Sequence, residues 1–107
     1  MTPDEVDGLL SGRPAPVLLD VRSSREYRQG HLPGAWHLPF WAALFGRLPV
    51  RPPGAPVIVY CGHGPRAWTA RLALRVRGVT GVALLDGHFA RWRRQGRDVV
   101  GPDRPSP

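Results

Sequence analysis

The only cysteine of this 107-residue chain, Cys61, stands in a segment whose residue types favour nucleophilic chemistry. Gly62 and Gly64 allow the backbone after it to turn tightly, and Pro65 is suited to the first turn of a helix. Loop amides and the positive end of a helix dipole favour bound anions, and they favour thiolate over thiol. Arg66 adds a planar cation suited to an oxyanion. This pattern predicts a nucleophilic cysteine in an anion-binding loop near the protein surface.

The elements on either side place this loop at the edge of a sheet. The run from Val57 to Tyr60 predicts a buried strand that ends immediately before Cys61. The apolar-rich segment from Ala67 to Val76 predicts a helix. Ligands of parallel α/β sheets bind beyond the carboxyl ends of strands, where these elements place the cysteine. A lone cysteine is usually a small buried hydrophobe, but that role requires neither the glycines nor the arginine.

The rest of the chain alternates between predicted helices and strands. Capping boxes at Thr2 with Glu5 and at Ser23 with Glu26 predict two helix starts. Helices are expected to about residue 10, to about residue 28, over 40–45 and over 87–95, and strands over 17–21, 35–38 and 82–85. This alternation predicts an α/β fold with a parallel sheet.

Composition narrows the classes of function. The net charge of +7 would steer an anionic substrate or an acidic partner to the surface, and no motif indicates nucleic-acid binding. No apolar run approaches the roughly 20 residues of a membrane span, and one cysteine fits a reducing cytoplasm. We expect one domain over residues 1–100 and a disordered tail over 101–107. No cofactor is expected, and the scattered histidines indicate no metal site.

Three motifs in order resemble those of the rhodanese domain, a family of single-domain sulfurtransferases. They are Leu19-Asp20-Val21-Arg22 with Glu26-Tyr27 and Gly30-His31-Leu32-Pro33-Gly34-Ala35, then Cys61-x-x-Gly64-x-Arg66-Ala67, and finally Leu85-Asp86-Gly87 with Trp92 and Gly96. The last motif usually carries two adjacent glycines, and Asp86 departs from that pattern outside the loop. The resemblance covers about residues 3–100.

The resemblance implies a three-layer fold with four or five parallel strands and helices on both faces. It also implies that the Cys61 thiolate takes a sulfane sulfur from an anionic donor such as thiosulfate. The resulting persulfide would pass its sulfur to a thiol or cyanide, or to a protein acceptor. A persulfide anion needs donors, and the amides available for it belong to Gly62, His63, Gly64, Arg66 and Ala67.

Supporting roles around the loop leave alternatives open. Arg66 is expected to bind the donor's oxyanion, or else to brace the loop. Asp20 and Arg22 could form an ion pair that orients the loop. Alternatively, Asp20 only caps the next helix. His63 is expected to face solvent, although it could titrate beside the thiolate.

Two other classes of function compete with sulfur transfer. Related folds use a cysteine–arginine loop in phosphatases and arsenate reductases, but tyrosine phosphatases have five residues between the two, and this chain has four. A non-catalytic binding module is the third hypothesis. The retained Cys61 and Arg66 argue against it.

Overall fold

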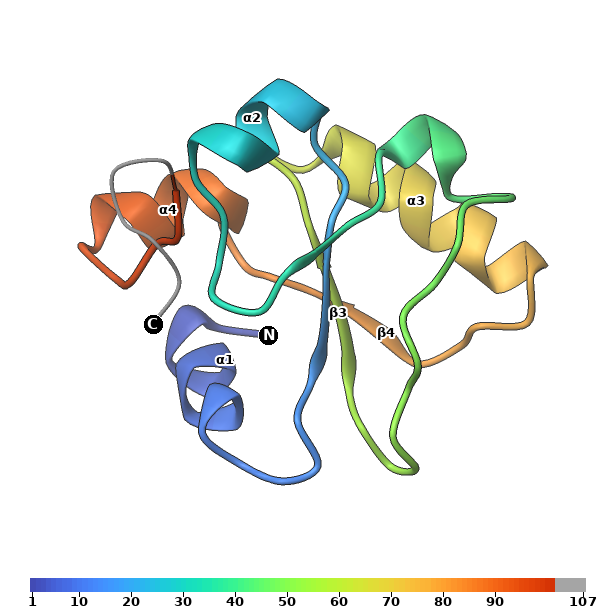
Figure 1. Ribbon diagram of the computed structural model, residues 1–107, viewed down its shortest axis with the longest axis horizontal. Helices are drawn as coiled ribbons and strands as arrows, with labels where there is room; N and C mark the ends of the chain where they lie inside the picture. Colours follow the sequence, from blue (N-terminus) through green and yellow to red (C-terminus); the bar gives the residue numbers. More distant parts are fainter. Residues whose placement is uncertain (102–107) are drawn as a thin grey trace.

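The computed structural model describes residues 1–101, and its centre is a four-stranded parallel sheet (Figure 1). The strands are β1 (Val17–Asp20), β2 (Trp36–His37), β3 (Val57–Tyr60) and β4 (Val82–Leu84). Their spatial order is β2-β1-β3-β4, and every neighbouring pair is parallel. In the central register, Leu19 of β1 lies opposite Val59 of β3 and Trp36 of β2. The predicted α/β class and parallel sheet are confirmed.

One helix precedes the first strand, one follows the last strand, and the other three connect successive strands. The helices are α1 (Pro3–Leu10), α2 (Ser24–Gln29), the 3-10 helix η1 (Phe40–Ala42), α3 (Pro65–Val76) and α4 (His88–Arg94). Both predicted capping boxes are present, at the starts of α1 and α2. The helix expected over 40–45 is wrong in extent, because the amides of Phe45 and Gly46 both donate to the Ala42 carbonyl and turn the chain there.

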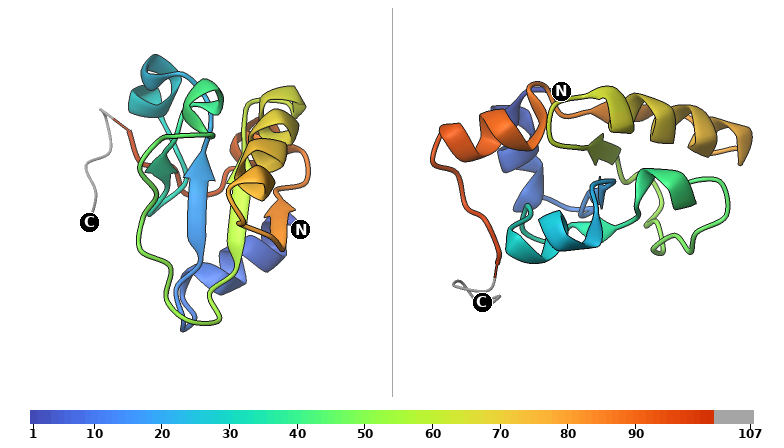
Figure 2. Two further views of the ribbon diagram at one scale, coloured as in Figure 1. Left: turned by 90° about the vertical axis from the view of Figure 1, so that its right-hand side faces the viewer. Right: turned by 90° about the horizontal axis from the view of Figure 1, so that it is seen from above.

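Alternating side chains of the strands divide the core into two clusters, one on each face of the sheet. Leu18 and Ile58 pack with side chains of α1 and α4, and Leu19 and Val59 pack with side chains of α3 and η1. The views from the front and from the side show these layers, with α1 and α4 on one side of the strands and α3 on the other (Figures 1 and 2). The three-layer arrangement follows from this alternation.

The C-terminal segment returns to the body of the protein. Val100 forms an antiparallel bridge with His31, and Arg97 pairs with Asp4 and Asp7 of α1. Of the predicted tail, Gly101 is described and residues 102–107 lie outside the described residues. The assignment of residues 1–100 to one domain stays a prediction. Among residues 1–101, no helix is long and apolar enough to cross a membrane.

Candidate active site

Cys61 lies where the sequence predicts, between the end of β3 and the start of α3. Gly64 takes a φ of 137°, which favours glycine, and its amide donates to the Cys61 Sγ at 2.9 Å. The loop lies near the surface, with His63 and Pro65 exposed, but Cys61 itself has no exposed surface. A tight turn around the sulfur, closed by a hydrogen bond of the loop backbone, accounts for this burial.

The other predicted amide donors differ in how they are used. Ala67 donates its amide to the Gly64 carbonyl at 3.0 Å, within the first turn of α3. Among the described residues, only the Gly64 amide makes a hydrogen bond to the sulfur. Roles for the amides of Gly62, His63 and Arg66 toward a bound sulfur therefore stay predictions. The side chain of His63 is exposed, as expected.

Arg66 makes a two-pronged ion pair with Glu26, a residue for which the sequence indicated only a helix cap. Its Nη1 lies 2.6 Å from Glu26 Oε1, and its Nη2 lies 3.1 Å from Oε2. These bonds hold the pKa of the Glu26 carboxyl well below its ordinary value, at about 2, and raise the pKa of the Arg66 guanidinium. Gly62 leaves room for this arm, since a Cβ there would lie 3.2 Å from Nη2. The ion pair thus fixes the position of Arg66, and both predicted roles, binding of an oxyanion and bracing of the loop, stay predictions.

A second ion pair lies buried at the end of β1. Arg22 donates from Nε and Nη2 to both carboxylate oxygens of Asp20, at distances from 2.8 to 3.2 Å, and also donates to the Gly30 carbonyl. The Tyr60 hydroxyl donates to Asp20 at 2.7 Å and accepts from the Leu32 amide at 3.0 Å. The predicted pair is confirmed as a contact, while Ser23 is the residue that caps α2.

This buried pair reaches the loop through Phe89 of α4. The Arg22 guanidinium stacks over the Phe89 ring, 4.0 Å from its centre. The amide of Phe89 donates to the Cys61 carbonyl at 3.0 Å, and the amide of Ala90 donates to the Gly62 carbonyl at 3.3 Å. The start of α4 therefore holds the backbone of the loop, and Arg22 packs against that start.

His88, the first residue of α4, contacts the backbone of Cys61. Its Nδ1 accepts from the Cys61 amide at 3.2 Å. The side chain is buried, which lowers the pKa of the imidazole below its ordinary value. Sequence reasoning missed this residue. The contact joins positions 27 residues apart, and His88 lies in a segment that was interpreted only as the start of a helix.

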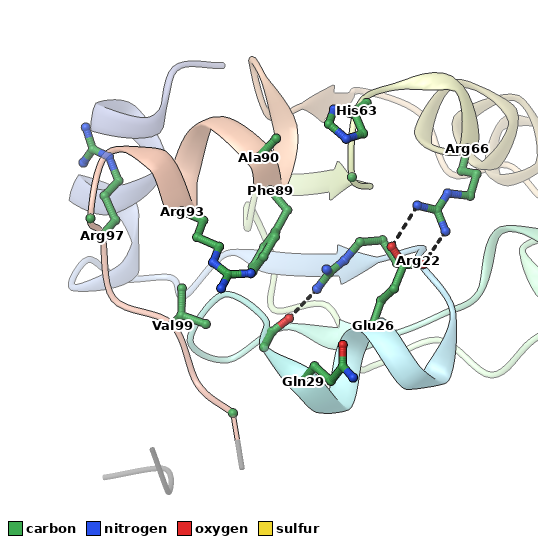
Figure 3. Close-up of a pocket in the computed structure, with 14 residues that line it drawn as sticks. Arg22, Glu26, Gln29, His63, Arg66, Phe89, Ala90, Arg93, Arg97 and Val99 are labelled. Atoms are coloured by element: carbon green, nitrogen blue, oxygen red, sulfur yellow. Dashed lines mark hydrogen bonds and ion pairs between the residues drawn. The ribbon is translucent and has the colours of Figure 1, made fainter. Parts of the chain in front are cut away.

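An open cleft of about 590 Å³ runs beside the loop between α2 and α4 (Figure 3). Gly62 and His63 form part of its wall, and the arginines that line it are Arg22, Arg66, Arg93 and Arg97. Three of these pair with carboxylates, whereas Arg93 makes no ion pair with any residue of the described range 1–101. The cleft thus presents arginine side chains beside the loop. Within the same range, no three His, Cys, Asp or Glu side chains gather where they could hold a metal ion.

Comparisons with known proteins place this geometry in context. A family model described as the rhodanese-like domain matches residues 2–95. A sulfurtransferase of Allochromatium vinosum is 32% identical in an alignment of length 91, and the match covers 81% of this chain and 80% of that protein. The crystal structure of thiosulfate sulfurtransferase from Pseudomonas aeruginosa has a TM-score of 0.80 and 30% identity, covering 94% of this chain and 19% of that one. A Rhodopseudomonas palustris protein of unknown function, described as a possible tyrosine phosphatase, has a TM-score of 0.72 and 26% identity, covering 92% and 82%.

Proposed function

Because this chain belongs to the rhodanese-like domain family, as its motifs predict, we propose that it is a sulfurtransferase with Cys61 as its nucleophile. The observation that carries the proposal is the hydrogen bond from the Gly64 amide to the Cys61 Sγ. A donor aimed at the sulfur stabilises a negative charge there, and both the thiolate and the persulfide anion carry that charge.

In the first step, the Cys61 thiolate attacks the outer, sulfane sulfur of an anionic donor such as thiosulfate. A bond forms between Sγ and the sulfane sulfur while the sulfur–sulfur bond of the donor breaks, and sulfite leaves with the electron pair. The arginines that line the cleft support an anionic donor, because they give it an attractive path to the loop. Arg66 holds its guanidinium beside Gly62 at the rim of this path.

In the second step, a thiolate or cyanide attacks the outer sulfur of the persulfide. The new bond to the acceptor forms as the bond to Sγ breaks, and the Cys61 thiolate is regenerated without any external oxidant or reductant. A protein thiol could serve as acceptor by the same chemistry. A reducing cytoplasm would keep the cysteine free for this cycle, and the proposal includes that location.

Hydrolysis of a phosphate ester is the second candidate, since one structural neighbour carries the description of a possible tyrosine phosphatase. The loop argues against it. Only four residues separate Cys61 from Arg66, and Pro65 offers no amide. A missing donor in such a cradle costs about a hundredfold in rate.

Mass spectrometry of the protein after treatment with thiosulfate tests the proposal. We expect an adduct of about +32 Da, one sulfur atom, on the wild-type protein and none on Cys61→Ala. Sulfate, which holds no sulfane sulfur, is the matched control reagent and should add no mass. Cyanide should then remove the adduct and yield thiocyanate.

An assay with an aryl phosphate separates the remaining classes. Efficient hydrolysis without a sulfur adduct would replace sulfur transfer by the phosphatase reaction. A protein that forms no adduct and hydrolyses nothing, while folded, would be a binding module.

A further inference from the structure

We propose that His88 is a positioning residue of the active loop, whose imidazole holds the Cys61 amide and so fixes the conformation in which the sulfur reacts. The inference deepens the proposed function and rests on it for its consequences for rate. It is carried by a backbone outlier, a buried hydrogen bond to the Cys61 amide and the proximity of the ring to Gly64.

The backbone of His88 takes a conformation that side chains rarely adopt. Its φ is 53°, and within residues 1–101 it is the only residue other than glycine with a positive φ. Gly87 before it has a φ of 73°, so two successive residues are left-handed at the start of α4. Glycine adopts such a conformation freely, whereas histidine carries a steric cost. A strained residue beside a nucleophile indicates a function for its side chain.

The side chain of His88 has a defined proton arrangement. A backbone amide can only donate, so Nδ1 must be the unprotonated acceptor of the 3.2 Å bond from Cys61. The neutral ring then carries its proton on Nε2. That atom would lie 3.5 Å from a Cβ at Gly64, the residue whose amide donates to the sulfur. The ring therefore spans from the backbone of the nucleophile to the backbone that contacts its sulfur.

The two backbone polar groups of Cys61 are both held from α4. Its amide donates to His88, and its carbonyl accepts from the amide of Phe89. Without Nδ1, the Cys61 amide would be buried with no acceptor or would turn toward the sulfur and change the loop. The Cys61 amide is thus bonded to a side chain of α4, and the Gly64 amide is the one that donates to Sγ.

The surroundings keep the ring neutral. Burial lowers the pKa of His88, the negative charge of Asp86 opposes this effect, and the nearby His63 adds to it. Asp86 itself pairs with the ammonium of Met1, which weakens its pull on the ring. Protonation of His88 would place a hydrogen on Nδ1 and abolish the bond to Cys61. The loop should therefore lose this hydrogen bond in acid, at a pH below the ordinary pKa of histidine.

Three variants separate positioning from a merely structural role. His88→Asn places an amide oxygen at the same number of bonds from the backbone as Nδ1, and asparagine tolerates a positive φ. His88→Gln moves the amide to the place of Nε2. His88→Gly has no acceptor but suits the backbone best, so it keeps the variant folded. Circular dichroism verifies the fold of each.

The first readout is the rate of persulfide formation from thiosulfate. We expect a loss of about tenfold for His88→Gly and His88→Gln, and less than about twofold for His88→Asn. The ratio of the wild-type rate to the His88→Asn rate should also fall as the pH drops from about 8 to about 5. At position 88, histidine can be protonated in this range and asparagine cannot. Equal rates in all folded variants, with a ratio that does not change with pH, would overturn the inference.

The second readout needs no sulfur donor. Alkylation of Cys61 by iodoacetamide should be about tenfold faster in His88→Gly than in the wild type, since a released loop exposes the sulfur, while His88→Asn should match the wild type. Identical alkylation rates would refute positioning. A wild-type protein that forms no persulfide, yet shows this pattern of alkylation, would refute the sulfurtransferase function and leave the role of His88 in place.

Discussion

Two arginine–carboxylate pairs lie at the same edge of the sheet, and they differ in burial. The side chains of Arg22 and Asp20 are 5% and 0% exposed, whereas those of Arg66 and Glu26 are 31% and 37% exposed. The first pair also binds Tyr60 and the Gly30 carbonyl, and only its arginine reaches the cleft, whereas both partners of the second pair line the cleft. The same chemistry therefore has two roles: the inner pair stabilises the sheet edge, and the outer pair places a cation at the wall of the cleft.

The difference follows from the cost of removing charges from water. A buried pair is strongly destabilising when one partner is lost, because the other charge is left without compensation. An exposed pair contributes little to stability, since solvent screens it, so its partners can be exchanged for a ligand at low cost. Substitutions in the two pairs should accordingly affect different measurements.

Asp20→Ala should have the largest effect, and it should be on folding. It removes the acceptor of both Arg22 and the Tyr60 hydroxyl, and we expect the free energy of unfolding to fall by about 3–5 kcal/mol. Urea denaturation measures this change. Asp4→Ala is the matched control, because it removes a carboxylate that is 88% exposed from an ion pair and should change stability by less than about 1 kcal/mol. Equal losses in the two variants would erase the distinction between the pairs.

Arg66→Lys should act on the reaction and spare the fold. Lysine keeps the charge but loses the planar pair of donors, and we expect kcat/KM for thiosulfate to fall about tenfold with an unchanged melting temperature. Arg75→Lys, in the last turn of the same helix, is the control and should leave both values unaltered. A lower melting temperature with normal kinetics would mean that the outer pair is structural as well.

Acid should weaken the outer pair by protonating Glu26. The folded protein holds the pKa of this carboxyl at about 2, below its ordinary value of 4.5, so its stabilising contribution is complete above about pH 4.5 and is lost as the pH falls toward 2. The effect is small, below about 1 kcal/mol, because the group is exposed. The difference in unfolding free energy between the wild type and Glu26→Gln should therefore shrink between pH 6 and pH 3. A constant difference would contradict the pairing.

Arg93→Gln should have the smallest effect. This side chain lines the cleft without an ion pair in the described part of the chain, so it acts on a ligand only by steering. We expect KM for thiosulfate to rise about twofold at low salt, and the difference to vanish at about 1 M salt. Arg94→Gln, its neighbour outside the cleft, should show neither effect. A similar rise in both variants would indicate net charge alone.

The parts of the fold that could be predicted from sequence are those with local signals. The capping residues Thr2 and Ser23, the apolar run of β3 and the glycines after Cys61 each act on neighbouring positions, so spacing reveals them. The contacts that complete the site are not local. Glu26 meets Arg66 across 40 residues, and His88 meets Cys61 across 27, so no periodicity marks either contact.

Local composition can also mislead. The apolar residues over 40–45 favour a helix by type, but a turn at Ala42 ends it after three residues, and both Trp41 and Phe45 remain exposed. Likewise, the capping box explains the presence of Glu26 by a local contact, so the sequence gives no sign of its ion pair with Arg66. A residue that satisfies a local rule can still carry a long-range contact.

The hydrogen bond between Tyr60 and Asp20 makes the absorbance of Tyr60 a probe of the folded state. The chain holds two tyrosines, and burial beside the Asp20 carboxylate raises the pKa of both, that of Tyr60 by far the more. In an alkaline titration followed by the ultraviolet absorbance of tyrosinate, Tyr27 should ionise first, while Tyr60 stays protonated and adds no tyrosinate absorbance. The second half of the absorbance then appears only when the sheet opens, so the spectrum records the state of the edge that supports the active loop.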